Sequence, residues 1–348
     1  MEANTRQPLI GSEETVFDPA DEYAMPDYVE PSTNFLFHIE RFETNPIIHR
    51  EMQGLVGDAG VNINGPSLIR VPDWIENPLG NYYLYFAHHK GAYIRLAYAD
   101  DLEGPWIIYE PGVLPLADTP GYASHPGDHL ASPDVHIDQD RKQIRMYYHQ
   151  RLSTENDFYW GQGTYVALSK DGLNFEAKPE ILGLPYFRVY EYDGWSYAIA
   201  KHGRIGAVIY RSQNGLTDFS GIEEAPRGIP RVRHKALWKH NGMLYVFFSR
   251  LFDEPEHIYV SRIENLEDDW QDWRFTEPQS VLRPEEDYEG VNQPIERSEP
   301  GVTYEFVHQL RDPGIYEEDG RLFLLYSTAG ERAIAIAELH FEDPISIP

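Results

Sequence analysis

The sequence predicts an all-β protein in which five small sheets form a five-bladed β-propeller. A pattern of entry segment, hairpin with a tight polar turn, and third strand recurs five times along the chain. The copies start roughly 50–80 residues apart, and repeats of small sheets at such a spacing indicate propeller blades. Aromatic residues make up 14% of the chain, which suits sheets that pack face to face. Helices are expected to be few.

The last two copies of the repeat align without gaps. Residues 311–323 lie over residues 233–245, so that Asp-Gly at 319–320 and Asn-Gly at 241–242 fall at the same turn. Asp-Gly and Asn-Gly are strong signals of a two-residue β-hairpin, because both central residues must adopt positive φ. The other copies start at Gly65, Ser132 and Arg188.

The two ends of the chain are predicted to share the last blade. Little sequence follows the third strand of the last copy, at 333–337, so its outer strand has to come from elsewhere. The run at 35–42 alternates well enough to supply that strand. Closing the ring in this way removes free sheet edges. Residues 33–348 are therefore predicted to form one propeller domain, with residues 1–32 as an acidic N-terminal tail or arm.

Composition argues against several classes of partner. The net charge is −28, from 29 Lys and Arg against 57 Asp and Glu, and so acidic a surface repels nucleic acid. No apolar run approaches the length that spans a membrane. The chain has no cysteine, which excludes disulfides and thiolate metal sites. Its start lacks the features of a signal peptide; we expect a cytoplasmic protein, or a periplasmic or secreted one if a signal peptide has been removed.

Basic residues concentrate where a propeller brings strand ends together. The start of each inner strand and the end of each second strand meet at the same face of the central channel. One interpretation is that the cations there neutralise carboxylates and cap strand ends. The other is a polar, partly cationic pocket for an anionic or hydroxyl-rich ligand. The candidate binding residues are Asn64, His88, His89, His125, His149, Arg188, His202, Arg233, Arg250 and Arg311.

Three motifs carry a resemblance to a known group of proteins. They are Arg-Asp-Pro at 311–313, Ser-Pro-Asp-Val at 132–135 and Tyr-Tyr-Leu-Tyr at 82–85. The chain resembles the five-bladed propeller glycoside hydrolases, the group that includes families 43, 32, 62, 117 and 130. The resemblance runs from about residue 45 to the C-terminus. It implies an enzyme that hydrolyses glycosidic bonds.

Family 43 implies a general base in the first blade, an Asp in the second that tunes the pKa of the acid, and a Glu acid in the third. Asp134 matches the second of these positions. The first blade has Asn-Gly-Pro at 64–66 and therefore lacks the base, while Tyr186 and Arg188 stand near the position expected for the acid. The chemistry of family 43 therefore does not transfer intact.

Ring closure suggests how the missing base is replaced. Because blade five neighbours blade one, Asp312 is predicted to lie at the channel mouth as the base, with Asp134 as a pKa modulator or orienting group. His234 is the first candidate for the acid, since family 117 accepts a His in that role. Glu296, in a loop before blade five that could fold over the mouth, is the second. The alternative is structural: Asp before Pro often caps a turn, and Arg311 then simply pairs with Asp312.

The leading hypothesis is a glycoside hydrolase, exo-acting on an anionic or anhydro sugar of a poly- or oligosaccharide. A polysaccharide lyase that uses His234, Tyr186 and Arg188 on a uronate is one alternative, and a non-catalytic carbohydrate-binding propeller is another. No cofactor is expected to be required; a divalent or sodium ion in the central channel stays open, because related propellers often hold one. The expected partner is a carbohydrate, and the N-terminal arm could join copies into a homo-oligomer.

Overall fold

The computed structural model describes residues 28–32, 36–122, 129–152, 161–202, 206–221 and 229–342. Nearly all regular structure in these ranges is β-strand. The described helical segments are single 3-10 turns, and none of them is long and apolar enough to cross a membrane. They are η1 (Gly57–Gly60), η2 (Leu116–Asp118), η4 (Trp270–Asp272) and η5 (Asp287–Glu289).

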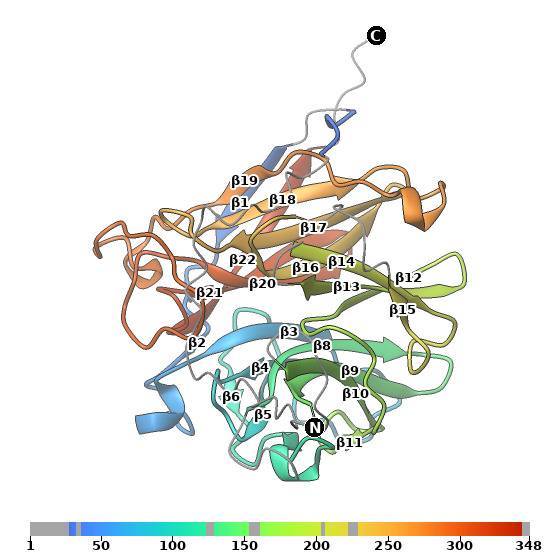
Figure 1. Ribbon diagram of the computed structural model, residues 1–348. Coiled ribbons are helices and arrows are strands. Elements are labelled where there is room, and N and C mark those ends of the chain that lie inside the picture. The colour runs from blue at the N-terminus through green and yellow to red at the C-terminus, as the bar shows by residue number, and fades with distance from the viewer. Residues whose placement is uncertain are drawn as a thin grey trace, which may run out of the picture.

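Five antiparallel sheets form the five blades that the sequence predicts. Their inner strands, numbered here from blade 1 to blade 5, are β3 (Asn64–Arg70), β8 (Ala131–Asp138), β12 (Arg188–Tyr192), β16 (Val232–His240) and β20 (Arg311–Glu318). β3 lies beside β8 and β20, and β16 lies beside β12 and β20. Val189 of β12 donates its N–H to Asp134 of β8 at 2.8 Å, so the inner strands follow one another around a central axis (Figure 1).

The remaining strands of each blade follow outward from the inner one. Blade 1 continues through β4 (Tyr82–Ala87), β5 (Tyr93–Ala99) and β6 (Ile107–Ile108), with β7 (Leu114–Pro115) also paired to β5. Blade 2 continues through β9 (Gln143–Arg151), β10 (Gln162–Ser169) and β11 (Glu176–Ala177). Blade 3 continues through β13 (Trp195–His202), β14 (Gly206–Ser212) and β15 (Ser220–Gly221). Blade 4 continues through β17 (Met243–Arg250), β18 (Ile258–Ile263) and β19 (Gln279–Leu282).

Blade 5 takes its outer strand from the other end of the sequence. After β21 (Arg321–Thr328) and β22 (Ala333–Glu342), the next strand is β1 (Leu36–Arg41), antiparallel to β22. β2 (Ile48–His49) pairs with the beginning of β22. The N-terminal strand therefore occupies the place predicted for it. Of the predicted arm, residues 28–32 are described, and Val29 bridges Thr276 of blade 4.

Local sequence explains the turns. In the hairpins that end three inner strands, Asp193, Asn241 and Asp319 have φ of 48°, 48° and 51°, and each is followed by a glycine of positive φ. Both central residues thus lie in the left-handed region, as a type I′ turn requires.

Four inner strands begin with a bulge, at a shift in pairing register. In three of these bulges the residue before a proline has positive φ: Gly65 (63°), Ser132 (52°) and Asp312 (49°). Proline cannot donate to the strand ladder, so a bulge at the start of a strand accommodates it. A bulge also redirects side chains, which matters because Asp312 occupies one of these positions.

The blades pack through clusters of aromatic and aliphatic side chains. Tyr83 and Tyr85 of blade 1, for example, share a buried cluster with Ile144 and Tyr148 of blade 2. Near the axis the backbones themselves come close. A Cβ on Gly314 of β20 would lie 2.5 Å from the carbonyl oxygen of Pro66 on β3, so the approach of blade 5 to blade 1 requires glycine there.

Phe37 tests the contribution of the N-terminal strand. Its ring lies 5.4 Å from that of Phe247 and 5.2 Å from that of Phe341, centroid to centroid. We expect Phe37→Ala to lower the free energy of unfolding by about 2–3 kcal/mol in urea titrations, since a large packed ring is lost. His38→Ala, on the exposed face of the same strand, is the control and should change it by less than about 0.5 kcal/mol. Equal effects of the two substitutions would contradict a packed β1.

Candidate active site

Asp312 and His234 meet at the start of two neighbouring inner strands. Asp312 is 2% exposed, and its Oδ1 contacts Nδ1 of His234 in blade 4. Its Oδ2 accepts a hydrogen bond of 3.1 Å from Oγ of Ser327, near the end of β21. The residue predicted as the base and the first candidate for the acid therefore lie together, with both carboxylate oxygens of Asp312 engaged.

A second buried carboxylate, Glu331, lies in the turn between β21 and β22. It is 1% exposed. Its Oε1 accepts a hydrogen bond of 3.1 Å from Arg311, and its Oε2 accepts one of 3.2 Å from Nδ2 of Asn64 in blade 1. Nδ1 of His89, also in blade 1, lies 3.5 Å from Oε2. Glu331 thus connects blade 5 to blade 1 at the channel mouth.

A third buried carboxylate, Glu256, lies between β17 and β18 and is fully buried. Its Oε1 lies 3.6 Å from Nε of Arg233, and its Oε2 lies 3.3 Å from Nε of Arg311. Ser249 also donates to Oε1, at 2.7 Å. With Glu331 these residues make an alternating series, Arg233–Glu256–Arg311–Glu331, which we call the buried ion-pair chain. It runs from blade 4 through blade 5 toward blade 1.

Sequence analysis missed Glu256 and Glu331, although the repeats hold a signal for both. Each stands two residues before the third strand of its blade, since β18 begins at Ile258 and β22 at Ala333. Each also pairs with the arginine that begins the repeat in its own blade, at 233 and 311. If the alignment of the two repeats is extended past the hairpin, with a gap for the different loop lengths, Glu256 aligns with Glu331.

The Asp312 and Glu331 carboxyls have opposite pKa shifts. Burial raises the pKa of Asp312 to about 6, and the negative charge of Glu331 adds to the rise, against the opposing effect of Arg233 and Arg311. Burial alone would raise the pKa of Glu331 too, but His89, Arg311 and Arg233 together hold it below its ordinary value. Carboxyl groups with separated pKa values are typical of acid–base sites.

A series of rings, which we call the ring belt, completes the circuit of the mouth. The ring of His234 lies 5.0 Å from that of Tyr186, which lies 4.1 Å from that of His149. His149 continues to His129 at 5.8 Å, and His129 stacks on His89 at 5.7 Å. The belt therefore passes from blade 4 through blades 3 and 2 to blade 1, where His89 approaches the end of the buried ion-pair chain.

Burial keeps two histidines of the belt neutral. It holds the pKa of His234 well below the usual value, with Arg233 and Lys201 adding to the effect. It does the same to the pKa of His149, helped by His129 and His234. Burial and the charge of Arg233 also lower the pKa of Lys201 to about 7. Nζ of Lys201 lies 5.1 Å from the ring centroid of Tyr186.

His234, Tyr186 and Lys201 border a small cavity of about 40 Å³. The residues that line it are His89, Gln162, Tyr186, Lys201, Arg233, His234, Leu251, Pro300 and Gly301. Arg233 holds the segment at Pro300 and Gly301 in place. Its guanidinium donates to the carbonyl oxygen of Glu299, at 2.8 and 2.9 Å, and to that of Gly301, at 2.7 Å. The loop before blade 5 thus reaches the mouth.

Ser132 is the residue of blade 2 that matches Asp312 in position. Asp134 lies two residues further along β8. Its Oδ2 lies 2.8 Å from Nε2 of His136 and accepts the N–H of Val189 at 2.8 Å. Burial would raise the pKa of Asp134, but His136 and then Arg188 lower it. The contacts recorded for Asp134 thus join blades 2 and 3, and do not include Asp312 or His234.

The other two predicted arginines, Arg188 and Arg250, are also engaged by the protein itself. Arg188 donates to the carbonyl oxygens of Lys235, Ser132 and Phe187 at 2.8, 3.1 and 2.9 Å, so it connects blades 2, 3 and 4. Arg250 donates to Asp253 at 3.1 Å. Both guanidinium groups are therefore committed to structure, Arg188 by carbonyl oxygens and Arg250 by a carboxylate.

The remaining predicted residues are less closely tied to the mouth. Glu296 is exposed, and the residues of its loop that line the cavity are Pro300 and Gly301. His88 follows β4, where burial and then Arg95 lower its pKa to about 4. His202 ends β13 and is half-buried. His125 lies outside the described residues.

Among the residues that the structure describes, no group of three or more His, Asp or Glu side chains is placed to hold a metal ion.

Comparison with known proteins places the chain among relatives. No family model matches it. It is 34% identical over 328 residues to the "Uncharacterized protein R118" of Acanthamoeba polyphaga mimivirus, an alignment that covers 86% of this chain and 90% of the viral one. The chain belongs to the same family as this mimivirus protein. The shared sequence therefore extends over most of the chain.

Solved structures share the fold of this mimivirus family at low sequence identity. A GH43 β-xylosidase/α-arabinofuranosidase from a compost metagenome superposes with a TM-score of 0.55 at 16% identity, covering 84% of this chain and 94% of that one. An exo-1,5-α-L-arabinanase from a bovine ruminal metagenome gives 0.54 at 12%, covering 82% and 94%. The α-L-arabinanase of Cellvibrio cellulosa gives 0.54 at 13%, covering 80% and 91%. The fold is thus the five-bladed propeller of these glycosidases.

The two shifted carboxylates make opposite predictions for stability. Asp312 binds its proton at higher pH in the folded chain than in the unfolded one, so its charge destabilises the fold at pH 7, and this cost disappears as the pH falls below about 6. Asp312→Asn should therefore raise the melting temperature at pH 7, by an amount that shrinks toward pH 4.

Glu331→Gln is the matched comparison. The lowered pKa of Glu331 means that its charge stabilises the fold above its ordinary value of 4.5, and that this contribution is lost in acid. The substitution should lower the melting temperature at pH 7 and make less difference as the pH falls below 4.5. Thermal melts between pH 4 and 8 measure both variants, and shifts of the same sign at pH 7 would contradict the assignment.

Proposed function

We propose that the protein is a glycoside hydrolase in which Asp312 takes the proton from the attacking water. The observation that carries the proposal is a buried carboxyl with a raised pKa at the mouth of a glycosidase-type propeller. A carboxylate with a pKa nearer the working pH is a stronger base while still being ionised at pH 7. The arabinanase and xylosidase names of the structural neighbours support a carbohydrate substrate.

His234 and Ser327 are proposed to position this base. Each contacts a different oxygen of Asp312, so the carboxylate plane is held at the mouth. The low pKa of His234 leaves the imidazole neutral. We therefore favour a positioning role for His234 over the role of acid that the sequence suggested.

Lys201 is our candidate for the group that protonates the leaving oxygen. It lines the same cavity as His234, and its pKa of about 7 leaves it partly protonated near neutral pH. The step is balanced: water gives a proton to Asp312 and its oxygen bonds to the sugar carbon, while the Lys201 ammonium gives a proton to the departing oxygen. Solvent exchange then restores both groups.

The lining of the cavity favours an anionic sugar. Its cations are Lys201, whose pKa of about 7 leaves it partly charged, and Arg233, which also pairs with Glu256; Asp312 lies behind this lining, in contact with His234. The volume of about 40 Å³ has room for one or two water molecules, since each occupies roughly 30 Å³. A sugar ring therefore needs the segment at Pro300 and Gly301, which Arg233 holds by hydrogen bonds, to move away.

A polysaccharide lyase is the second candidate. Its specific support is the neutral His234 beside Tyr186, with Arg233 in the same cavity lining. A neutral imidazole or a tyrosine can remove the proton next to a uronate carboxyl while an arginine neutralises that carboxyl. The products separate the two reactions, because a lyase leaves an unsaturated sugar that absorbs in the ultraviolet.

Activity assays on arabinan, xylan and polygalacturonate test the proposal. We expect new reducing ends without ultraviolet absorption, a preference for the uronate polymer that weakens with salt, and a loss of about 10²–10⁴ in rate in Asp312→Asn. Asp319→Asn, at the exposed far end of the same hairpin, is the control and should keep full activity. Ultraviolet-absorbing products would establish the lyase. Binding of polygalacturonate without any product would establish a non-catalytic propeller.

A further inference from the structure

A second cavity, of about 440 Å³, lies between blades 2 and 3. β8 starts at the mouth with Ala131 opposite His149 and ends with Asp138 opposite Gln143, and this cavity borders its far end. It therefore opens at the opposite end of the inner strands from Asp312. Its volume is within the usual range for ligand sites, roughly 300–1,000 Å³. Residues around it include His136, Asp138, Gln139, Glu191, Gln213 and Asn214.

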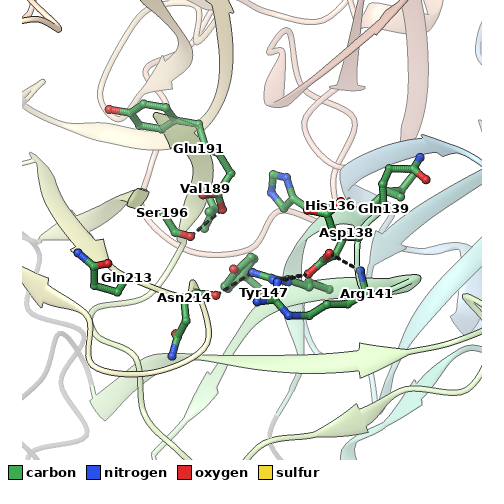
Figure 2. Close-up of a pocket in the computed structure, with 14 residues that line it drawn as sticks. His136, Asp138, Gln139, Arg141, Tyr147, Val189, Glu191, Ser196, Gln213 and Asn214 are labelled. Carbon is green, nitrogen blue, oxygen red and sulfur yellow. Dashed lines mark hydrogen bonds and ion pairs between the residues drawn. The ribbon is translucent and has the colours of Figure 1, made fainter. Parts of the chain in front are cut away.

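Two walls of polar side chains face each other across this space (Figure 2). His136, Asp138, Gln139 and Arg141 come from β8 and the turn that follows it, on one side. On the other side are Glu191, Ser196, Gln213 and Asn214, from β12, β13 and the turn after β14. Each wall belongs to one blade, so a ligand here would touch blade 2 and blade 3 together.

Several charged groups of the cavity already have partners. Asp138 accepts hydrogen bonds from Arg141, at 3.0 Å, and from Arg145. Nε2 of His136 lies 2.8 Å from Asp134. Arg141 and Arg145 are thus taken up by Asp138, whereas the carboxylates of Asp140 and Glu191 have no cationic partner among the described residues. No free cation is therefore left in this lining for an anionic ligand, while the two remaining carboxylates can accept hydrogen bonds from the hydroxyl groups of a neutral one.

Hydrogen-bonding capacity nevertheless remains. Glu191 accepts a single recorded bond, of 2.6 Å from Oγ of Ser196, and a carboxylate has about four acceptor sites. Gln139 and Gln213 are exposed amides that both donate and accept. The ligand that matches this mixture has many groups that are donor and acceptor at once, as hydroxyls are.

We infer that the cavity between blades 2 and 3 is a second carbohydrate-binding site, which takes a neutral oligosaccharide segment. The three acidic side chains in the lining, Asp138, Asp140 and Glu191, disfavour a phosphate or uronate there. The half-exposed ring of His136, whose side chain is 37% exposed, offers a flat surface to a sugar ring. This site holds the polymer at a distance from Asp312, and its existence does not depend on the reaction proposed for the mouth.

Affinity electrophoresis in gels that contain neutral arabinan, neutral xylan or polygalacturonate tests the second site. We expect at least one neutral polysaccharide to retard the wild-type protein. A Gln139→Ala/Gln213→Ala double variant should weaken that retardation about tenfold, as expected when hydrogen bonds worth roughly 1.4 kcal/mol are lost. Both side chains are exposed, so the fold should be unaffected.

The control is Gln53→Ala/Gln271→Ala, which removes two exposed glutamines outside the cavity lining and should leave retardation unchanged. Asp312→Asn should also be retarded normally. Absence of retardation by both neutral polysaccharides, or equal retardation of the double variant and the wild type, would overturn the inference. If the proposed hydrolysis is wrong but the second site exists, the activity assays give no products while the gels still retard the protein.

Discussion

The buried ion-pair chain is the constraint on which the channel mouth depends. Taking a charge out of water costs several kcal/mol, which is recovered only when an opposite charge lies close and the remaining lone pairs are bonded. Arg233, Glu256, Arg311 and Glu331 provide the opposite charges by alternating in sign from blade 4 to the edge of blade 1, although Oε2 of Glu256 and Nε of Arg311, 3.3 Å apart, make no hydrogen bond. Blades 4, 5 and 1 must therefore keep their relative positions. Asp312 lies beside the ion-pair chain, and its pKa is raised.

Sequence reasoning was most successful where a single residue decides the backbone. Asp-Gly and Asn-Gly at the hairpins specify positive φ, and the structure has it at Asp193, Asn241 and Asp319. Because little sequence follows the third strand of blade 5, the N-terminal strand was predicted to be its outer strand. In the structure, β1 pairs with β22. The meeting of Asp312 with His234 was also predictable, because they occupy matching positions of neighbouring repeats and a closed ring brings such positions together.

The parts that escaped prediction depend on how loops fold back. Glu256 and Glu331 lie in loops of different length, so their proximity follows from the third strands and from no local motif. Asp134 and Asp312 were predicted to flank Asn64 at the mouth, because blade 1 lies between blades 5 and 2 in a closed ring. Asp134, however, follows its proline, whereas Asp312 precedes its own. That two-residue offset moves Asp134 along the strand toward His136 and the second cavity. Polar chemistry thus gathers at both ends of the inner strands.

The pKa of Asp312 itself tests the account most directly. Carbon-13 NMR of carboxyl-labelled protein, with the Asp312 signal assigned by its loss in Asp312→Asn, gives that value. We predict a midpoint near 6, well above the ordinary 3.8. In Glu331→Gln the midpoint should fall, because the negative charge that helps to raise it is gone. A midpoint at or below the ordinary value, or one that Glu331→Gln leaves unchanged, would contradict the electrostatic coupling on which the proposed site is built.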